Sequence, residues 1–155
     1  MDINKLSVAE LKKNNIKLVR EFFIGEGYDL VKITGQGVQT KYEISKNNEK
    51  YTIKLMSYRF NPNARGNYAW TKKQNFQLVE YDYLFIVLYY YSKVYILKIP
   101  TEVFVKPKEC SAFKNHDYWN KKSAPEYGIS IDGNIDELLA YKVAESCNQF
   151  SLCNK

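Results

Sequence analysis

The residues best suited to chemistry in this chain are the basic and aromatic side chains between positions 46 and 73. Within this stretch seven Lys or Arg residues stand against a single acid, Glu49. The seven are Lys46, Lys50, Lys54, Arg59, Arg65, Lys72 and Lys73. Basic side chains bind phosphate groups, and aromatic rings stack on nucleobases. Because Tyr58, Tyr68 and Trp70 supply such rings, the stretch predicts a surface that contacts DNA or RNA.

The expected roles within this surface differ by residue type. Arg59, Arg65, Lys72 and Lys73 are expected to hold phosphates. Tyr68 and Trp70 either stack on bases or pack the loop that carries them, and both readings stay open. For the stretch as a whole, the alternative is a solvated loop without a partner.

Other motifs in the chain are weaker. His116 is the only histidine, so a Ser/His or Cys/His pair would depend on the fold bringing a cysteine next to it. The sequence around His116 lacks the other ligands of a zinc site, and residues 35–37 lack the rest of a dinucleotide fingerprint. Both segments are interpreted as loops.

The three cysteines, Cys110, Cys147 and Cys153, are an odd number without a Cys-x-x-Cys pair. This pattern argues against a disulfide framework and against a zinc knuckle. We therefore expect free thiols in a reducing, cytoplasmic compartment.

Composition favours one soluble domain over residues 1–155, because 45% hydrophobic residues suffice for a single core. The longest apolar run, residues 83–91, is too short to span a membrane as a helix, and the N-terminus lacks the apolar core of a signal peptide. A net charge of +6 and a pI near 9.0 favour a polyanionic partner.

The elements expected to position these residues begin with a helix. Residues 7–10 fit a capping box, apolar residues then recur at helical spacing, and Gly25 and Gly27 should end the helix. Three strands should follow as a meander at residues 28–33, 38–45 and 51–56. In the third strand Thr52, Lys54 and Met56 share one face, which should place Lys54 on the solvent side.

The composition changes over residues 57–77, where residues 59–67 should form an irregular loop that residues 70–73 follow. Residues 83–90 are apolar on both faces, as in a central strand, and should pair with residues 94–99. A brief helix is expected after Pro100, a loop over residues 106–123, and an edge strand at residues 127–131. Spacing of Ile135, Leu138, Leu139 and Val143 predicts a last helix that ends near Ser146.

This order of elements resembles the PD-(D/E)xK nuclease superfamily. The resemblance spans residues 17–105 and includes Tyr-Asp-Tyr at 81–83 and Ile-Pro-Thr-Glu at 99–102. It implies a restriction-endonuclease-like α/β (α+β) fold, a central mixed sheet of about five strands with an N-terminal and a C-terminal helix. It also implies two carboxylates that hold Mg²⁺ and a lysine that positions or helps to deprotonate the attacking water.

Carried onto this sequence, the resemblance makes Glu43 the first acid and metal ligand and Lys54 the catalytic lysine. The acid-x-lysine triplet departs from the family. Residues 52–54 keep the lysine and lack the acid, whereas residues 54–56 have Lys and Met where the acid and lysine belong. This departure puts the second metal ligand in doubt.

Two acids could replace the missing carboxylate, Glu21 on the first helix and Asp29 near the first strand. The competing interpretation is that Glu21 is a solvated helix residue and Asp29 a turn residue. For Glu43 and Lys54, the competing interpretation is a cross-strand ion pair on a solvent-facing sheet.

Two functional hypotheses follow. In the first, the protein binds nucleic acid and is related to the PD-(D/E)xK endonucleases, with an incomplete or rearranged site that uses Mg²⁺ if it cleaves. In the second, the protein is a non-catalytic interaction module that binds a nucleic-acid-processing enzyme through its tyrosine-rich surface. A homodimer is left open by both.

Overall fold

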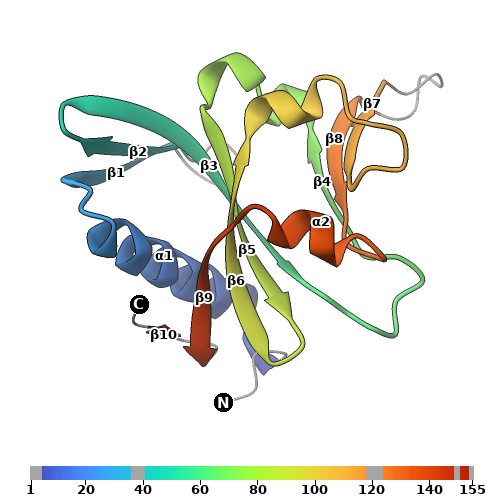
Figure 1. Ribbon diagram of the computed structural model, residues 1–155, viewed down its shortest axis with the longest axis horizontal. Coiled ribbons are helices and arrows are strands. Elements are labelled where there is room, and N and C mark those ends of the chain that lie inside the picture. Colours follow the sequence, from blue (N-terminus) through green and yellow to red (C-terminus); the bar gives the residue numbers. More distant parts are fainter. Residues whose placement is uncertain (1–4, 36–40, 118–123, 149–150, 154–155) are drawn as a thin grey trace.

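The computed structural model describes residues 5–35, 41–117, 124–148 and 151–153 (Figure 1). Helix α1 (Val8–Gly25) starts at the predicted capping box. The Glu10 amide donates to Ser7 Oγ at 3.2 Å, and the Ser7 amide donates to Glu10 Oε2 at 2.8 Å. Ser7 Oγ also donates to Glu10 Oε2 at 2.7 Å, and this bond, together with the one from the Ser7 amide, holds the pKa of Glu10 below its ordinary value. The helix ends at Gly25, as predicted, and Gly27 follows with φ +80°.

The main sheet has the order β1-β2-β3-β5-β6-β9, and the two-residue β10 pairs with β9 at its end. These strands are β1 (Leu30–Thr34), β2 (Lys41–Lys46), β3 (Glu49–Arg59), β5 (Tyr83–Tyr90), β6 (Lys93–Pro100), β9 (Lys142–Asn148) and β10 (Ser151–Leu152). β3 pairs with β5 in parallel and the other neighbours pair antiparallel, so the predicted mixed sheet is confirmed. The expected number of strands was too low because the C-terminal segment joins the sheet.

A second, three-stranded antiparallel sheet was not expected. Its order is β4-β8-β7, from β4 (Tyr68–Lys72), β8 (Glu126–Ser130) and β7 (Phe113–His116). The irregular loop predicted over residues 59–67 lies where it was expected, between the end of β3 at Arg59 and the start of β4 at Tyr68, whereas the strand β4 was not predicted. β8 is the central strand of this small sheet and not an edge.

The predicted last helix is also wrong beyond its first turn and a half. Helix α2 covers Ile135–Leu139, and the chain then enters β9. Val94 N donates to Ser146 Oγ at 3.0 Å, which holds β9 against β6. The apolar residues that occur at helical spacing therefore belong to two elements. Leu138 is a buried residue of α2, and Val143 packs against the core from β9.

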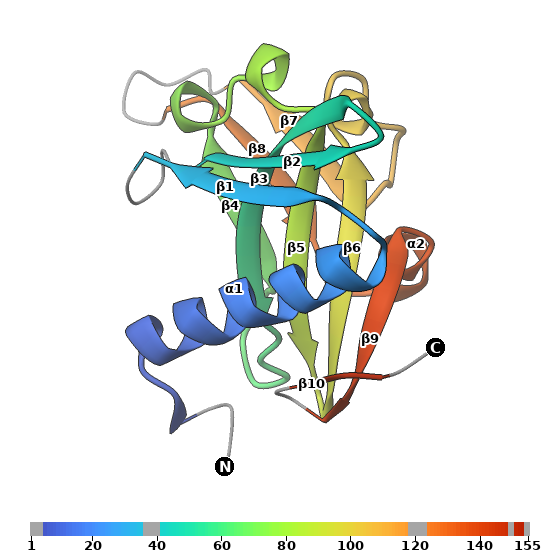
Figure 2. The same cartoon turned by 90° about the vertical axis from the view of Figure 1, so that its left-hand side faces the viewer.

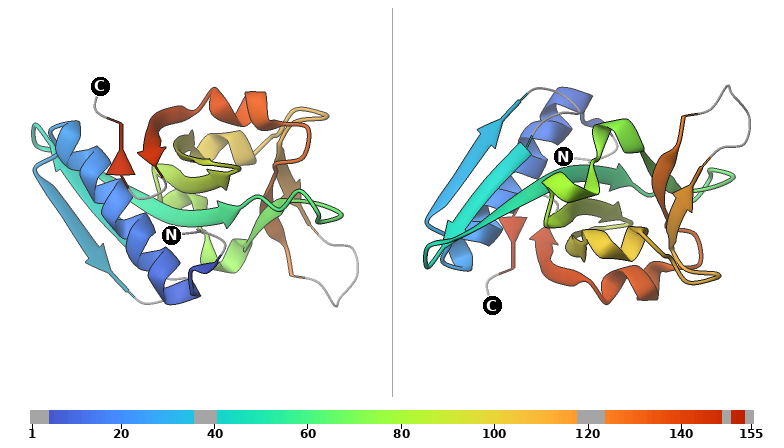
Figure 3. Two further views of the ribbon diagram at one scale, coloured as in Figure 1. Left: turned by 90° about the horizontal axis from the view of Figure 1, so that it is seen from below. Right: turned by 90° about the horizontal axis from the view of Figure 1, so that it is seen from above.

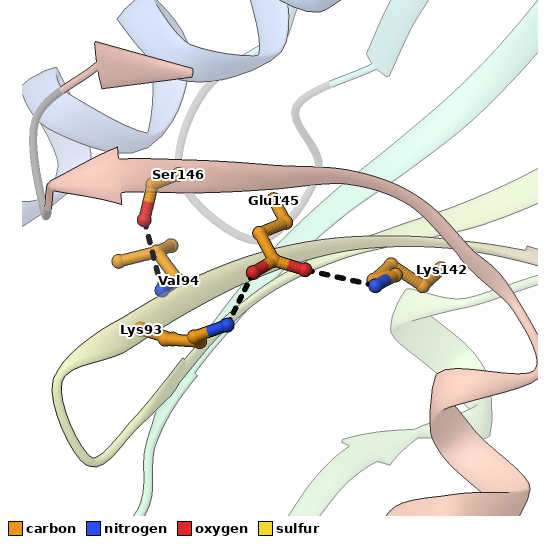
Figure 4. Close-up of polar contacts among 5 residues, drawn as sticks. All are labelled: Lys93, Val94, Lys142, Glu145 and Ser146. Carbon is orange, nitrogen blue, oxygen red and sulfur yellow. Dashed lines mark hydrogen bonds and ion pairs between the residues drawn. The ribbon is translucent and has the colours of Figure 1, made fainter. Parts of the chain in front are cut away.

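Glu145 on β9 accepts hydrogen bonds from Lys93 and from Lys142, the latter at 2.9 Å (Figure 4). The bonds from Lys142 and Lys93 lower the pKa of Glu145 to about 2. The carboxylate therefore stays charged at neutral pH and joins β9 to the start of β6.

Each face of the main sheet carries its own core. α1 crosses one face, where Phe23, Ile53 and Phe85 are buried together (Figure 2). The opposite face is covered by the small sheet, α2 and three short 3₁₀ helices, η3 (Lys73–Asn75), η4 (Leu78–Glu80) and η5 (Thr101–Phe104). Seen along the strands, α1 and the small sheet lie on opposite sides of the central strands (Figure 3).

The cysteine expectation needs one correction. Cys110 is an exposed free thiol, as predicted, whereas Cys153 is disulfide-bonded. The side chain of Cys147 lies outside the described part of the structure.

Candidate functional site

The first candidate site is a groove of about 410 Å³ between the N-terminal half of α1, β3 and β4. Its lining residues include Val8, Leu11, Lys12, Lys54, Trp70 and Thr71. Most of its surface is apolar, and none of its described lining residues is acidic. The groove can therefore accept a ligand that combines a planar or apolar group with an anionic group. No described lining side chain would repel the anion.

Three aromatic side chains on the small sheet form what we name the aromatic row, Tyr68, Trp70 and His116. The rings of Tyr68 and Trp70 are stacked, with centroids 5.8 Å apart and an interplanar angle of 25°. The rings of Trp70 and His116 lie 5.1 Å apart, tilted by 41°. Tyr68 is 45% exposed, His116 is exposed and Trp70 is half-buried. The row thus presents ring surface to solvent beside the groove.

Strand alternation explains why these rings share a face. Ala69 of β4 is buried in the core behind the small sheet, so Tyr68 and Trp70 point to the other side. On β7, Phe113 is likewise buried and His116 is exposed. The row therefore follows from the placement of the buried residues on both edge strands.

Gly128 on β8 is the residue over which Trp70 lies. It pairs directly with Trp70 across the β4–β8 ladder. A Cβ placed on Gly128 would lie 2.2 Å from Cε3 and Cζ3 of the Trp70 ring. No side chain fits there without moving the tryptophan, so glycine at this position lets the ring rest against the backbone.

A buried hydrogen-bond network anchors the start of β4. Asn67 is 1% exposed and donates from Nδ2 to Asn61 O at 2.9 Å and to Asp132 Oδ1 at 3.0 Å. Its Oδ1 accepts from Asn61 N at 2.8 Å and from the Tyr58 hydroxyl at 3.1 Å. Because this network joins the loop after β3 to the segment after β8, it fixes Tyr68, the next residue, in place.

The four predicted phosphate-binding residues do not form one patch. Arg59 ends β3, donates to Leu6 O at 3.4 Å and is half-buried. Lys73 follows the far end of β4, where its ammonium bonds to Asn115 and to Asp117 at 2.7 Å. β4 itself is about 13 Å long, because four rises of about 3.3 Å separate its first and last residues.

Arg65 and Lys72 are exposed, so they remain able to reach a ligand. Arg65 lies in the loop before β4, and Lys72 lies two residues after Trp70 on the same face of the small sheet. A further basic residue, Lys12 of α1, lines the groove beside Trp70.

The expectation that Lys54 faces solvent is wrong. Lys54 is 4% exposed, and its ammonium donates to Asn75 O at 3.0 Å. The ammonium lies 5.7 Å from the ring centroid of Tyr81 and 5.9 Å from that of Phe76. Burial lowers the pKa of Lys54. The alternation of β3 was predicted correctly, but η3 and its neighbours cover the face that carries Lys54.

The predicted acids lie apart from Lys54. Glu43 on β2 forms an ion pair with Lys32 of β1 at 3.9 Å, so the cross-strand pair expected with Lys54 is made with Lys32 instead. Glu21 pairs with Lys17 at 3.7 Å and lines a different cavity, beside β9 and β10. Asp29 is exposed, and its amide donates to Ser45 O.

These positions do not fit a magnesium site. Among the described residues no cluster of three or more His, Cys, Asp or Glu could hold a metal ion. The carboxylate of Glu43 has an ammonium as its neighbour, and Glu21 on α1 pairs with Lys17. Magnesium therefore stays an expectation of the family resemblance alone.

Three residues of the site were missed from the sequence. His116 was assigned to a loop, and Gly128 and Asn67 were not singled out. Residues 113–116 do not alternate between apolar and polar, so they carry no local signal for β7. The strand and the roles of Gly128 and Asn67 depend on contacts with residues far along the chain.

Comparisons with known proteins give little. No protein-family model matches the chain, and no curated protein matches it. Among solved structures, the crystal structure of MepB is similar with 17% sequence identity and a TM-score of 0.37, covering 72% of this chain and 76% of that chain. A likeness this weak carries no argument about fold or function.

Within the described residues, none of the helices combines the length and the apolar character needed to cross a membrane.

Proposed function

We propose that this protein binds single-stranded nucleic acid, with bases stacked on the aromatic row and phosphates held by the basic residues beside it. The observation that carries the proposal is the exposed stack of Tyr68 and Trp70, extended by His116, at the edge of a groove without a described acidic lining residue. Stacking on aromatic side chains is the usual way in which proteins hold bases without reading their sequence.

Single strands are favoured over duplexes by the geometry of stacking. In a duplex each base face is covered by its neighbours, so a protein ring can stack only on an unpaired or terminal base. The rings of the row lie on a sheet face, where they cannot enter a duplex as a wedge on a loop could. Lys12, Arg65 and Lys72 would contact the backbone of the strand.

The test is fluorescence anisotropy with labelled single-stranded DNA and RNA and with the matching duplexes, at several salt concentrations. We expect binding to single strands that weakens steeply as salt rises. Trp70→Ala should reduce the affinity by about 10-fold or more, because one stacked base contributes about 1 to 3 kcal/mol. Trp70→Phe is the matched control, since it keeps a ring at the position and should retain most of the affinity.

Equal affinity of Trp70→Ala and the unaltered protein would sink the proposal, as would binding to duplexes in preference to single strands. Circular dichroism melting of each variant separates a lost contact from a lost fold.

A second candidate is a protein-interaction module, which one observation favours. Val8 at the mouth of the groove is 79% exposed, and the groove is mostly apolar, as the centre of a protein interface is. Binding of a protein partner through this groove should change little with salt. Absence of any salt-sensitive binding to nucleic acid would favour this candidate.

The relationship to PD-(D/E)xK nucleases and cleavage by this protein stay predictions. Incubating the same oligonucleotides with Mg²⁺ or Mn²⁺, and with EDTA, tests them directly. Metal-dependent cleavage that is lost in Glu43→Ala would support an enzyme. Binding without cleavage would support the binding proposal and contradict the enzyme.

A further inference from the structure

A second cavity lies where the loop after β3 meets the turn between β5 and β6. It has a volume of about 900 Å³, within the size range of ligand pockets, and we name it the turn cavity. Its lining residues include Arg59, Phe60, Asn61, Tyr89 and Tyr91. Phe60 N donates to Tyr89 O at 2.8 Å, which joins the loop to β5. The turn cavity and the groove beside Trp70 share no described lining residue.

Tyr91 is an unusual residue for its position. It is 63% exposed and sits in the β5–β6 turn with φ +53°, a left-handed conformation that costs a non-glycine residue free energy. The β2–β3 turn meets the same requirement with Asn47 and Asn48, residue types that tolerate it. At the β5–β6 turn a large exposed ring occupies a position where Asn or Gly would adopt the left-handed conformation at a lower cost in free energy.

The ring of Tyr91 is part of an aromatic cluster at the cavity. Its centroid lies 5.3 Å from that of Phe60 and 4.8 Å from that of Tyr90. Phe60 and Tyr90 are themselves 4.7 Å apart. Neighbouring rings hold Tyr91 in position, so its exposed surface is preorganised for stacking.

Arg59 supplies the positive charge of the cavity, and no described lining residue is acidic. Nη1 of Arg59 donates to Leu6 O at 3.4 Å, which orients the guanidinium from the N-terminal side. Tyr89 lies buried below, with its hydroxyl donating to Asn15 Oδ1 at 2.6 Å and accepting from Asn14 Nδ2 at 2.9 Å. The arginine is thus held beside a polar network on the α1 side of the sheet, and it lines the same cavity as Phe60 and Tyr91.

We propose that the turn cavity binds a nucleoside 5′-phosphate, with the base against Tyr91 and Phe60 and the phosphate on Arg59. A cavity lined by aromatic rings and by a guanidinium matches a ligand that combines a planar base with an anion. The ligand is a free nucleotide or the phosphorylated 5′ end of a strand. The proposal does not depend on binding at the aromatic row.

The test is an amide NMR titration of the full chain with AMP, with adenosine and with inorganic phosphate. AMP should shift the amide signals of Phe60, Asn61 and Ser92, and should bind more tightly than either adenosine or phosphate. Tyr91→Gly should lower the AMP affinity by about 10-fold, because a stacking surface is lost. This variant should fold, since glycine adopts positive φ without strain.

Two further variants separate the contributions. Arg59→Gln should reduce the affinity for AMP to that for adenosine, because the guanidinium that would hold the phosphate is removed. Trp70→Ala should leave AMP binding unchanged, because Trp70 does not line the turn cavity. The variant therefore tests the aromatic row and the turn cavity separately.

A strand carrying a 5′-phosphate, compared with the same strand without it, distinguishes the two sources of the ligand. Tighter binding of the phosphorylated strand, lost in Tyr91→Gly, would identify a strand end. Equal binding of the two strands together with tight AMP binding would identify a free nucleotide. Unchanged AMP affinity in Tyr91→Gly, or shifts confined to other parts of the molecule, would overturn the proposal.

Discussion

Lys54 and Lys72 come from the same basic stretch, and the fold gives them opposite environments. Lys54 lies beneath η3 with its ammonium on a backbone carbonyl, and Lys72 is exposed beside Trp70. Both were assigned to one surface because both stand in strands or loops rich in positive charge. The comparison teaches that alternation sorts residues by face, whereas the elements that cover a face decide which residues meet a ligand.

The difference has a chemical consequence. In the apolar surroundings of Phe76 and Tyr81, the protonated form of Lys54 is disfavoured and its pKa falls. Beside the aromatic row Arg65 and Lys72 are exposed to water, where a phosphate can reach them. The exposed region is therefore where we expect function, and the buried one where we expect effects on stability.

The largest effect is expected for Asn67→Ala. The substitution removes four side-chain hydrogen bonds around a 1% exposed residue and leaves the partners at Asn61 and Asp132 unsatisfied. We expect a loss of about 3 kcal/mol in the free energy of unfolding, measured by urea denaturation. Asn63→Ala, at an exposed asparagine of the same loop, is the control and should change stability little.

Gly128→Ala should have the next largest effect, and it acts on the aromatic row. The new Cβ would lie 2.2 Å from the Trp70 ring, so the ring must move. We expect a cost of about 2 kcal/mol and weaker binding to single strands, as in Trp70→Ala. Gly25→Ala is the matched control, because a Cβ there meets nothing within 4 Å. Unchanged stability and binding in Gly128→Ala would show that the close approach of the ring to Gly128 has no role.

Lys54→Met tests the buried side of the comparison. The folded state holds the Lys54 proton less tightly than the unfolded state, so the lysine lowers stability at neutral pH, and this cost fades as pH rises to the ordinary value of 10.5. We expect Lys54→Met to be about 1 kcal/mol more stable at pH 7. The advantage should shrink between the lowered pKa and pH 10.5, which denaturation at several pH values can follow. An advantage that grows with pH would contradict the assignment.

The smallest effects should separate the neighbours Lys72 and Lys73. Lys73 bonds to Asp117 and lies 4.9 Å from the Tyr127 ring centroid, so Lys73→Ala should cost about 1 kcal/mol of stability without changing affinity. Lys72→Ala should do the reverse, weakening binding to single strands by about threefold and reducing its salt dependence. Melting curves and anisotropy titrations of the two variants provide the check, and identical profiles would contradict it.

Much of the first half of the fold could be predicted from local signals. The Ser7 and Glu10 side chains cap α1, Asn47 and Asn48 form the β2–β3 turn, and residues 83–90 form the central β5. Each of these depends on neighbouring residues only. Of the site, the accessibility of Arg65 and Lys72 was also predicted, whereas the exposure of Tyr68 was left open by the sequence.

The errors share a physical cause, which is pairing between distant segments. Residues 68–72 become a strand because β8 pairs with them, and residues 142–148 become β9 because the edge of β6 accepts them. Neither partner can be identified from local periodicity, since hydrogen bonds across a sheet join residues many positions apart.

By itself the sequence determined the helix start, the turns, the alternation along β3 and the excess of positive charge between residues 46 and 73. Only the tertiary structure decided that Lys54 is buried, that Glu43 pairs with Lys32, and that Trp70 rests over Gly128 beside His116. The reason is that local conformation depends on neighbours in the chain, whereas burial and ring contacts depend on which segments the sheet brings together.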